Sequence, residues 1–307
     1  MRVASIDIGT NTVLLLVAER DASGTLVAVR EEATITRLGE GVDVSRVLKP
    51  EAIARTNECL TRYGALCREL GVEKTAVVGT SAMRDAGGGD AVREHVRSAL
   101  GVDARTISGD EEARLTFRGA LSGMSGVEGD VVVFDIGGGS TEIVAAKAGG
   151  NLTGGEVAFA KSFDIGSVRL TERHLRSDPP TEPELDELRD GVRRVLREVP
   201  ELPRSGPPIG IAGTVTTLAA VAMGLAPYDG ARVHGFTMSK ELLAKVLRDL
   251  AVMPNAERRN VRGLEPKRAD VIVAGGAIAL GVLDALHADS MRISDRGVRW
   301  GLAETLA

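Results

Sequence analysis

The sequence contains few cysteines and few aromatic residues. Among its 307 residues are two cysteines, one tryptophan, two tyrosines and five phenylalanines. Cys59 and Cys67 lie in a stretch with helical spacing, and a secreted disulfide framework would need more cysteines. We therefore expect both to be reduced thiols in a cytoplasmic protein.

Long apolar runs and an excess of positive charge are also missing. No window approaches the ~18 apolar residues of a membrane span. The N-terminal apolar stretch is interrupted by Asp7 and Asn11, and no small-residue cleavage site follows, which excludes a signal peptide. The net charge is −5, from 38 Lys and Arg against 43 Asp and Glu. A general nucleic-acid binder depends on basic residues that neutralise phosphates, so we expect neither nucleic acid nor membrane as a partner.

Several catalytic motifs are absent as well. The sequence has no G-x-x-x-x-G-K-[ST], no G-x-S-x-G, no H-x-x-x-H and no C-x-x-C. Its four histidines are scattered along the chain, which argues against a zinc site.

What the sequence does contain is an internal repeat. Residues 129–146 repeat the pattern of residues 2–18: an apolar strand, Asp-Ile-Gly, small polar residues and a second apolar strand, at an offset of 135 − 7 = 128. A repeat of this size predicts two similarly folded lobes with a cleft between them. The Gly/Ser-rich stretch 122–130 marks the boundary, which gives lobes of 1–125 and 126–307. The last helix, about 296–307, could pack back on the first lobe.

Strands and helices alternate in both halves, which indicates the α/β class. The expected strands are 3–8, 13–19, 25–34, 75–78, 104–107, two within 129–146, 156–160 and 209–212. The expected helices are 49–70, 91–100, 109–121, 168–175 and 182–199, and further helices fill most of the remainder.

The repeated turns suit an anionic ligand. Each copy, Asp7–Thr12 and Asp135–Thr141, places a carboxylate at a strand end before a tight turn. Glycines let backbone amides approach an anion closely, and the hydroxyls add donors. Two carboxylates can hold Mg²⁺, or Mn²⁺, directly or through water. An ordinary Asp-Gly hairpin explains one copy alone, but two copies one domain apart favour a phosphate site.

Further segments strengthen this interpretation. The two turns resemble the phosphate motifs of the actin-like ATPase superfamily. Within it, the chain resembles the exopolyphosphatase/guanosine pentaphosphate phosphohydrolase family, through the segments 79–86 (GTSAMRDA), 107–120, 210–219 and 263–276. The resemblance implies two actin-like (ribonuclease H-like) lobes, Mg²⁺ dependence and a homodimer. Because the sequence to Ala307 contains no His-Asp dipeptide, we expect the short form, without a C-terminal His-Asp-type domain.

The resemblance also implies roles for individual acidic and basic residues. Glu112 would orient or deprotonate the attacking water, although it could, like Glu111, merely complement the helix dipole. Glu142 would be a second water or metal contact, unless it is a solvent-facing strand residue. Arg84 would bind phosphate, because a guanidinium fork suits phosphate oxygens. The alternative for Arg84 is a surface position beside Asp85.

A third phosphate-contacting loop is implied at the start of a helix. Gly213 and Thr214 follow a buried-type strand there, although the Gly-Thr turn could serve packing alone. The basic run from Arg258 to Arg268 is either a guide for an anionic chain or a solvated helix face. The full expected phosphate-binding set is Thr10, Asn11, Thr12, Arg84, Gly137, Gly138, Gly139, Ser140, Thr141, Gly213 and Thr214, with Asp7 and Asp135 as metal ligands.

These expectations define a reaction. We expect a phosphohydrolase that releases terminal orthophosphate from inorganic polyphosphate by Mg²⁺-assisted in-line attack of water. The alternative substrate is guanosine pentaphosphate. Alternatives of another class are an ATP-dependent kinase and a nucleotide-switched binding protein.

Overall fold

The computed structural model describes residues 1–124, 126–148 and 157–307. Contacts within the chain define two compact units. Unit 1 contains Met1–Gly119 together with Val298–Ala307, and unit 2 contains Ala120–Gly297. The boundary expected from the sequence falls a few residues later, between 125 and 126, and Ser125 itself lies outside the described residues.

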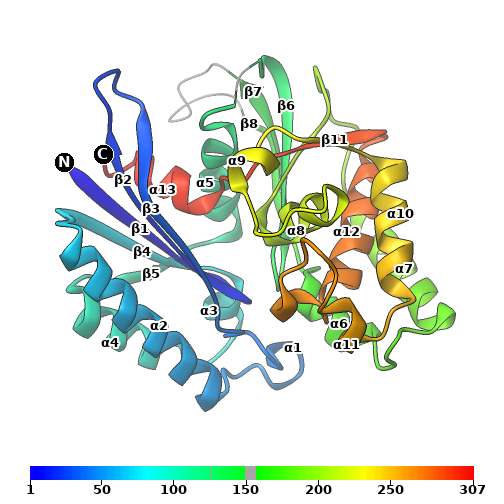
Figure 1. Cartoon of the computed structure of the whole chain (residues 1–307), viewed down its shortest axis with the longest axis horizontal. Helices are drawn as coiled ribbons and strands as arrows, with labels where there is room; N and C mark the ends of the chain where they lie inside the picture. The colour runs from blue at the N-terminus through cyan, green and yellow to red at the C-terminus, as the bar shows by residue number, and fades with distance from the viewer. Residues whose placement is uncertain (125, 149–156) are drawn as a thin grey trace. The chain divides into compact units, whose positions relative to one another are not determined.

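Unit 1 is built on a five-stranded sheet with the order β3-β2-β1-β4-β5 (Figure 1). Strands β1, β2 and β3 form antiparallel hairpins, and β4 and β5 continue the sheet parallel to β1. The carboxyl ends of β1, β4 and β5 therefore share one sheet edge. The strands are β1 (Arg2–Ile8), β2 (Thr12–Arg20), β3 (Leu26–Ile35), β4 (Lys74–Gly79) and β5 (Ala104–Thr106).

Helices cover both faces of this sheet. Apolar residues of α2 and α4 form a core with β1, β2 and β4, and apolar residues of α13 pack with other residues of the sheet. Cys59 and Cys67 are free thiols buried in α2, and burial raises the pKa of Cys67 to about 11. The helices of unit 1 are α1 (Val42–Ser45), α2 (Pro50–Glu69), α3 (Ser81–Asp85), α4 (Gly89–Leu100), α5 (Gly109–Leu121, continuing into unit 2) and α13 (Val298–Glu304).

Unit 2 repeats this topology and extends it by one strand. Its sheet has the order β10-β11-β9-β6-β7-β8. Again three antiparallel strands come first, and the next two strands of the sheet lie parallel to β6. The strands are β6 (Gly129–Ile136), β7 (Thr141–Ala148), β8 (Val157–Phe163), β9 (Ile209–Ile211), β10 (Thr237–Ser239) and β11 (Ser290–Ile293).

The core of unit 2 is a single apolar cluster of strand and helix residues. Helix α12 contributes its small and aliphatic residues from Ile272 to Leu283 and is buried on most sides. The helices are α6 (Ser167–His174), α7 (Glu182–Leu196), α8 (Ala212–Ala222), α9 (Gly230–Val233), α10 (Lys240–Ala251), α11 (Asn255–Arg258), the 3₁₀ helix η1 (Pro266–Arg268) and α12 (Ile272–Ala285).

The α/β class and the internal repeat predicted from the sequence are confirmed. The expected strands and helices are present, although Glu156, in the expected strand 156–160, lies outside the described residues. Strands β10 and β11 fall in a region predicted to be mostly helical. Each has only three or four residues, too few for a period-of-two pattern to emerge. None of the helices in the described ranges is long and apolar enough to cross a membrane.

Candidate active site

Three functional segments of unit 1 follow the three strands that end at one edge of its sheet. In the parallel ladders, Ile8 pairs with Gly79, and Gly79 with Thr106. The turn after β1 carries the predicted phosphate residues, α3 after β4 carries Arg84, and α5 after β5 carries Glu112. Ligand contacts in α/β sheets collect at such an edge. The predicted residues of unit 1 are therefore brought to a common edge by strand register alone.

Glu112 and Arg84 form an ion pair at this edge. Arg84 Nη1 lies 2.9 Å from Glu112 Oε2, and the Glu112 side chain is 8% exposed. Glu111 instead pairs with Arg105, also at 2.9 Å, and its side chain is 39% exposed. Successive helical residues point about 100° apart, because an α-helix has 3.6 residues per turn. The structure therefore turns Glu112 inward toward Arg84 and leaves Glu111 at the surface.

Arg84 is held by more than one group. Its Nη1 also donates to the carbonyl of Ile107 (3.2 Å), and its Nε lies 3.6 Å from Asp85. The pairing with Asp85 expected under the surface interpretation is thus present, but it coexists with the shorter ion pair to Glu112. The guanidinium is therefore placed by Asp85 of α3, by Ile107, which follows β5, and by Glu112 of α5.

The turn of unit 1 directs its carbonyl groups toward one neighbouring segment. The carbonyl of Thr10 accepts from Gly39 N, and that of Asn11 accepts from the amides of Thr36 and Arg37. Within the described residues, the N–H groups of Thr10 and Asn11 have no acceptor. In the same part of the chain, Thr10 Oγ1 and both polar side-chain atoms of Asn11 are buried without a hydrogen-bond partner. Unsatisfied buried polar groups are uncommon in proteins, and here they collect where a phosphate was predicted.

The turn of unit 2 has the same construction. Gly137 N donates to Ser140 O (3.0 Å), as Gly9 N does to Thr12 O (3.1 Å) in unit 1. All three glycine carbonyls are bound by the start of α6, and within the described residues the N–H groups of Gly138, Gly139 and Ser140 have no acceptor. Successive free amides form an anion-binding nest. The carbonyl contacts are Ser167 N to Gly137 O (2.9 Å), Val168 N to Gly138 O (2.9 Å), Arg169 N to Gly138 O (3.1 Å) and Arg169 Nε to Gly139 O (2.7 Å).

Two carboxylates lie side by side in unit 2. Asp135 and Glu142 are directly opposite each other in the antiparallel ladder of β6 and β7, so their side chains share one face of the sheet. Ser162 Oγ donates to Glu142 Oε1 at 2.6 Å. Glu142 is only 1% exposed, so the alternative of a solvent-facing strand glutamate is wrong.

These carboxylates are compatible with a magnesium ion. No group of three or more potential metal-ligating side chains occurs within the described residues. Mg²⁺ prefers oxygen ligands, usually keeps several waters and is commonly bound by one or two carboxylates plus substrate phosphates. Asp135 and Glu142 in unit 2, or Asp7 in unit 1, supply donors of that kind.

Two predicted phosphate ligands use their hydroxyl groups within the protein. Thr141 Oγ1 donates to Ile165 O (2.6 Å), and Thr214 Oγ1 donates to Ile136 O (3.1 Å). A hydroxyl has one hydrogen to donate, so these side chains fix the backbone around the turn. Ala212, at the start of α8, has a φ of 68°, a strained value for a residue with a Cβ. The β9–α8 junction beside Gly213 is thus held in an unusual conformation.

Residues of the basic run from Arg258 to Arg268 have different surroundings in the structure. Arg258 is 2% exposed and donates to the carbonyls of Ala269 (2.6 Å) and Met253 (2.8 Å), so it holds the loop and does not guide a substrate. Arg268 lies over the start of α8, where its guanidinium occupies the space that a Cβ on Gly213 would need. Both side chains come from one charge run, and only their tertiary contacts separate them.

The sequence analysis did not single out Arg169. It is buried in α6 and donates to the carbonyl of Gly139 in the predicted phosphate turn of unit 2, yet by sequence it is one arginine among many, next to a helix start. A basic residue two positions after Gly166-Ser167, in the first turn of a helix, was the one available signal, and it is a weak one.

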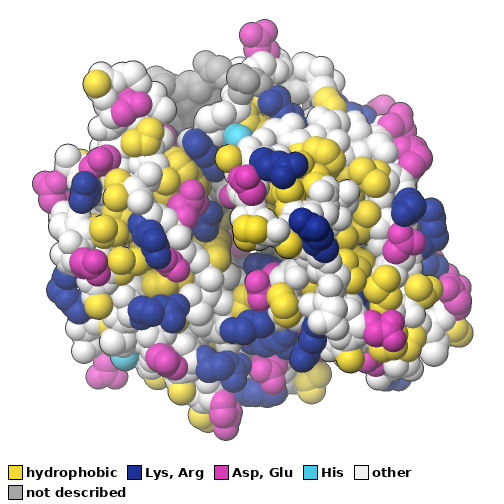
Figure 2. Space-filling model, viewed as in Figure 1, with side chains coloured by type: hydrophobic (Ala, Val, Ile, Leu, Met, Phe, Trp, Pro, Cys, Tyr) yellow, Lys and Arg dark blue, Asp and Glu magenta, His cyan; other side chains and the backbone are white. Residues whose placement is uncertain are grey.

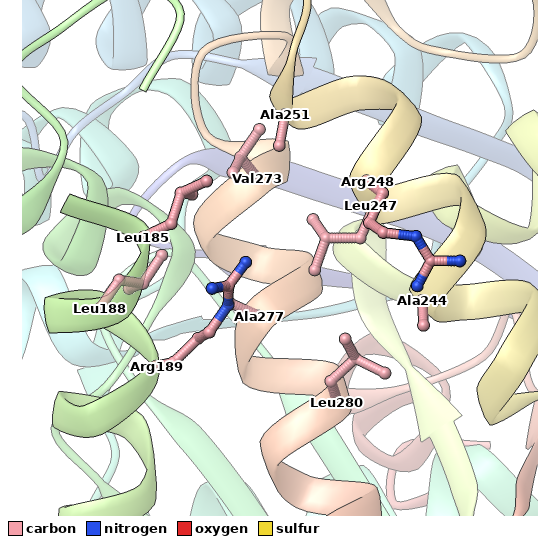
Figure 3. Close-up of a pocket in the computed structure, with 10 residues that line it drawn as sticks. All are labelled: Leu185, Leu188, Arg189, Ala244, Leu247, Arg248, Ala251, Val273, Ala277 and Leu280. Carbon is pink, nitrogen blue, oxygen red and sulfur yellow. The ribbon is translucent and has the colours of Figure 1, made fainter. Parts of the chain in front are cut away.

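A separate hollow occurs on unit 2, away from all of these residues. It has a volume of about 220 Å³ and lies among α7, α10 and α12 (Figure 3). Its lining is mostly apolar, and Arg189 of α7 and Arg248 of α10 are its two charged lining residues. None of the predicted site residues lines the hollow.

The face of the molecule drawn in Figure 2 carries basic and acidic side chains intermixed.

Comparison with known proteins shows which family this chain resembles over its length. Residues 16–306 match the model of the Ppx/GppA phosphatase family. The chain is 40% identical to exopolyphosphatase 2 of Mycobacterium tuberculosis, over 100% of the chain and 98% of that protein. It is 27% identical to a guanosine-5'-triphosphate,3'-diphosphate pyrophosphatase of Vibrio atlanticus, over 98% of the chain and 58% of that protein.

A solved crystal structure of the same family has a similar fold. The crystal structure of the Aquifex aeolicus member of the Ppx/GppA family is similar with a TM-score of 0.82 at 35% identity, covering 100% of this chain and 97% of that one. The prediction of two actin-like α/β lobes is thereby confirmed.

Proposed function

The chain belongs to the Ppx/GppA phosphatase family, and we propose that it releases orthophosphate from the end of inorganic polyphosphate. It is a phosphoanhydride hydrolase, as its family indicates. The observation that carries the choice of mechanism is the ion pair of the buried Glu112 with the partly buried Arg84, at the sheet edge that also bears the predicted phosphate turn of unit 1. The full-length similarity to an exopolyphosphatase supports polyphosphate as substrate.

In the proposed reaction, this chain's own groups bind and orient the terminal phosphoryl group. In unit 1 the free amides of residues 10–11 donate to its oxygens, and Arg84 neutralises charge that develops on them; in unit 2 the free amides of residues 138–140 form a second nest for phosphate. Glu112 accepts a hydrogen bond from the attacking water and takes its proton as the water adds to phosphorus. The bond to the bridging oxygen breaks, and the shortened polyphosphate leaves with the electron pair.

Phosphatases of this kind are generally metal-dependent, and we propose Mg²⁺, with Mn²⁺ as a substitute. In unit 2, Asp135 and Glu142 would hold it, and in unit 1 Asp7 offers an oxygen donor of the kind that Mg²⁺ prefers. When bound, the ion neutralises charge on the phosphoanhydride oxygens. Because Asp135 and Glu142 are cross-strand partners, β6 and β7 pre-position two of these ligands without any contribution from a loop.

Guanosine pentaphosphate is the second candidate substrate. The similarity to the Vibrio protein favours it, and amide nests recognise a terminal phosphate whatever is attached beyond it. Family membership sets aside the kinase and the nucleotide-switched binding protein considered from the sequence. A homodimer and a cytoplasmic location are further proposals, which gel filtration with light scattering and cell fractionation would test.

The decisive experiment measures orthophosphate release with Mg²⁺ from long-chain polyphosphate, guanosine pentaphosphate and ATP, side by side. We expect polyphosphate to be fastest and Glu112→Gln to be nearly inactive. Glu111→Gln is the matched control, because it removes the neighbouring carboxylate and should keep full activity. Faster release from guanosine pentaphosphate would transfer the proposal to that substrate, and three intact substrates would refute it.

A further inference from the structure

The most informative unexplained residue is Arg169, a buried arginine beneath the phosphate turn of unit 2. It is 6% exposed, although arginine is seldom buried without a specific partner. Its Nε donates to the carbonyl of Gly139 at 2.7 Å, and its backbone N–H donates to that of Gly138 at 3.1 Å. One residue therefore fixes two consecutive peptide groups of the turn.

Fixing these carbonyls also fixes the amides that follow them. A trans peptide is planar, so its C=O and N–H point in opposite directions. With Gly139 O turned toward the Arg169 guanidinium, the N–H of Ser140 must point away from it. The same reasoning, applied to Gly138 O, turns the N–H of Gly139 away from α6. These are two of the amides without an acceptor among the described residues.

The equivalent position of unit 1 shows that this arrangement is not a requirement of the fold. There the matching carbonyl, that of Asn11, accepts from two backbone amides, those of Thr36 (3.1 Å) and Arg37 (3.0 Å). In unit 2 the charged side chain of Arg169 donates to the corresponding carbonyl, that of Gly139. A hydrogen bond from a charged donor is stronger than a neutral one, and it polarises the peptide whose N–H it directs.

We propose that Arg169 is a positioning residue for phosphate binding, which acts through the Gly139–Ser140 peptide and does not touch the substrate. It orients and polarises the amide of Ser140, so that this N–H is directed at a phosphoryl oxygen before the substrate arrives. The inference rests on the proposed function only in that the turn binds phosphate. Beyond that function, the inference identifies Arg169 as a residue that controls how tightly the turn binds phosphate.

The test compares two buried arginines of the same unit. Arg169→Lys and Arg169→Met remove the guanidinium under the turn. Arg258→Lys is the matched control, because Arg258 is equally buried and also donates to two carbonyls, but it lies outside the turn. For each full-length variant, the Kd of orthophosphate is measured by calorimetry, together with KM and kcat on polyphosphate and the melting temperature.

We expect Arg169→Met to raise the orthophosphate Kd and the polyphosphate KM about tenfold, as loss of a charge-assisted hydrogen bond predicts. Arg169→Lys should raise both constants by a smaller factor, because its ammonium group can still donate a hydrogen bond. Arg258→Lys should lower the melting temperature and leave Kd and KM unchanged. If Arg169→Lys behaves like Arg258→Lys, the residue is merely structural and the proposal is overturned.

A measurement on the unaltered protein covers the case in which the Arg169 variants do not fold. Orthophosphate should shift the amide resonance of Ser140 in a ¹⁵N-labelled sample, and an unmoved resonance would overturn the proposal. If the wild type binds orthophosphate but hydrolyses no polyphosphate, the proposed function fails while the role of Arg169 is still decided by the Kd values. If orthophosphate does not bind at all, both proposals fail.

Discussion

The two units of this protein have the same backbone plan and different chemistry. At the end of the first strand, one row of cross-strand neighbours reads Ala33, Leu14, Asp7 and Val78 in unit 1, and the matching row in unit 2 reads Ser162, Glu142, Asp135 and Ile211. The aspartate is common to both rows. The second carboxylate and its serine partner exist only in unit 2.

The turns that follow show the same contrast. In unit 1, Thr10 and Asn11 contribute side-chain donors and acceptors, whereas Gly138 and Gly139 in unit 2 offer backbone alone. The Arg84–Glu112 pair follows β4 and β5 in unit 1, and the corresponding junction after β9 in unit 2 has Gly213 and Thr214. The same scaffold therefore occurs twice, with the Arg84–Glu112 ion pair in unit 1 and the paired carboxylates Asp135 and Glu142 in unit 2.

Among the tests of this contrast between the units, the largest expected effect on activity is that of removing Arg84 from unit 1. Arg84→Met should lower kcat/KM on polyphosphate by about 10²–10³, because an arginine that neutralises transition-state charge contributes on that scale. Steady-state orthophosphate release is the measurement. Arg105→Met is the matched control: it removes the exposed arginine that pairs with Glu111, and it should change activity less than about twofold. Equal losses in both variants would contradict the assignment.

A smaller effect is expected when unit 2 is made to resemble unit 1. Glu142→Leu places at this position the residue that unit 1 has at Leu14, and leaves one carboxylate in the row. We expect the Mg²⁺ concentration for half-maximal activity to rise about tenfold, the lower end of what altered metal sites show. Ser162→Ala, which keeps both carboxylates and removes only the hydrogen bond to Glu142, should raise it less. An unchanged Mg²⁺ requirement in Glu142→Leu would exclude Glu142 as a ligand.

The two turns should also respond in opposite directions to the same substitution. Thr10→Val removes a buried hydroxyl that has no partner within the described residues, and should raise the free energy of unfolding by about 1 kcal/mol while weakening orthophosphate binding. Thr141→Val removes a hydroxyl that donates to Ile165 O, and should lower stability by about 1 kcal/mol. Chemical denaturation of both variants tests this. A destabilised Thr10→Val would show that the hydroxyl serves folding.

The smallest expected effect is a pH dependence confined to unit 2. Burial lowers the pKa of His234, whose ring contacts Gly123 O and the Asp295 amide. A depressed folded-state pKa contributes stability that is present above the unfolded value of about 6.5 and is lost as the pH falls through the folded value. His234→Gln should therefore flatten the loss of stability below about pH 6.5, as followed by melting temperature against pH. If, below about pH 6.5, the melting temperature of the variant falls as steeply as that of the wild type, His234 is not the source of the pH dependence.

The positions of the site residues were only partly predictable from the sequence. The inward direction of Glu112 and the outward direction of Glu111 agree with the preference drawn from the resemblance, because adjacent helical residues face different ways. The burial of Glu142 could not be read from one strand, since alternation does not reveal which face is covered. The hydroxyls of Thr141 and Thr214 looked like phosphate donors, and only their carbonyl neighbours show that they are engaged.

The sequence by itself determined the α/β class, the duplication and the two Asp-Ile-Gly turns, because periodicity and glycine placement are local properties that survive without knowledge of distant contacts. Tertiary structure decided which groups each arginine of the chain contacts. Arg84, Arg169 and Arg258 are equivalent as letters, yet they meet a carboxylate, a glycine carbonyl of the phosphate turn and a structural loop. A guanidinium acquires its role from the acceptors that the fold brings to it, and those acceptors come from residues far away in the chain.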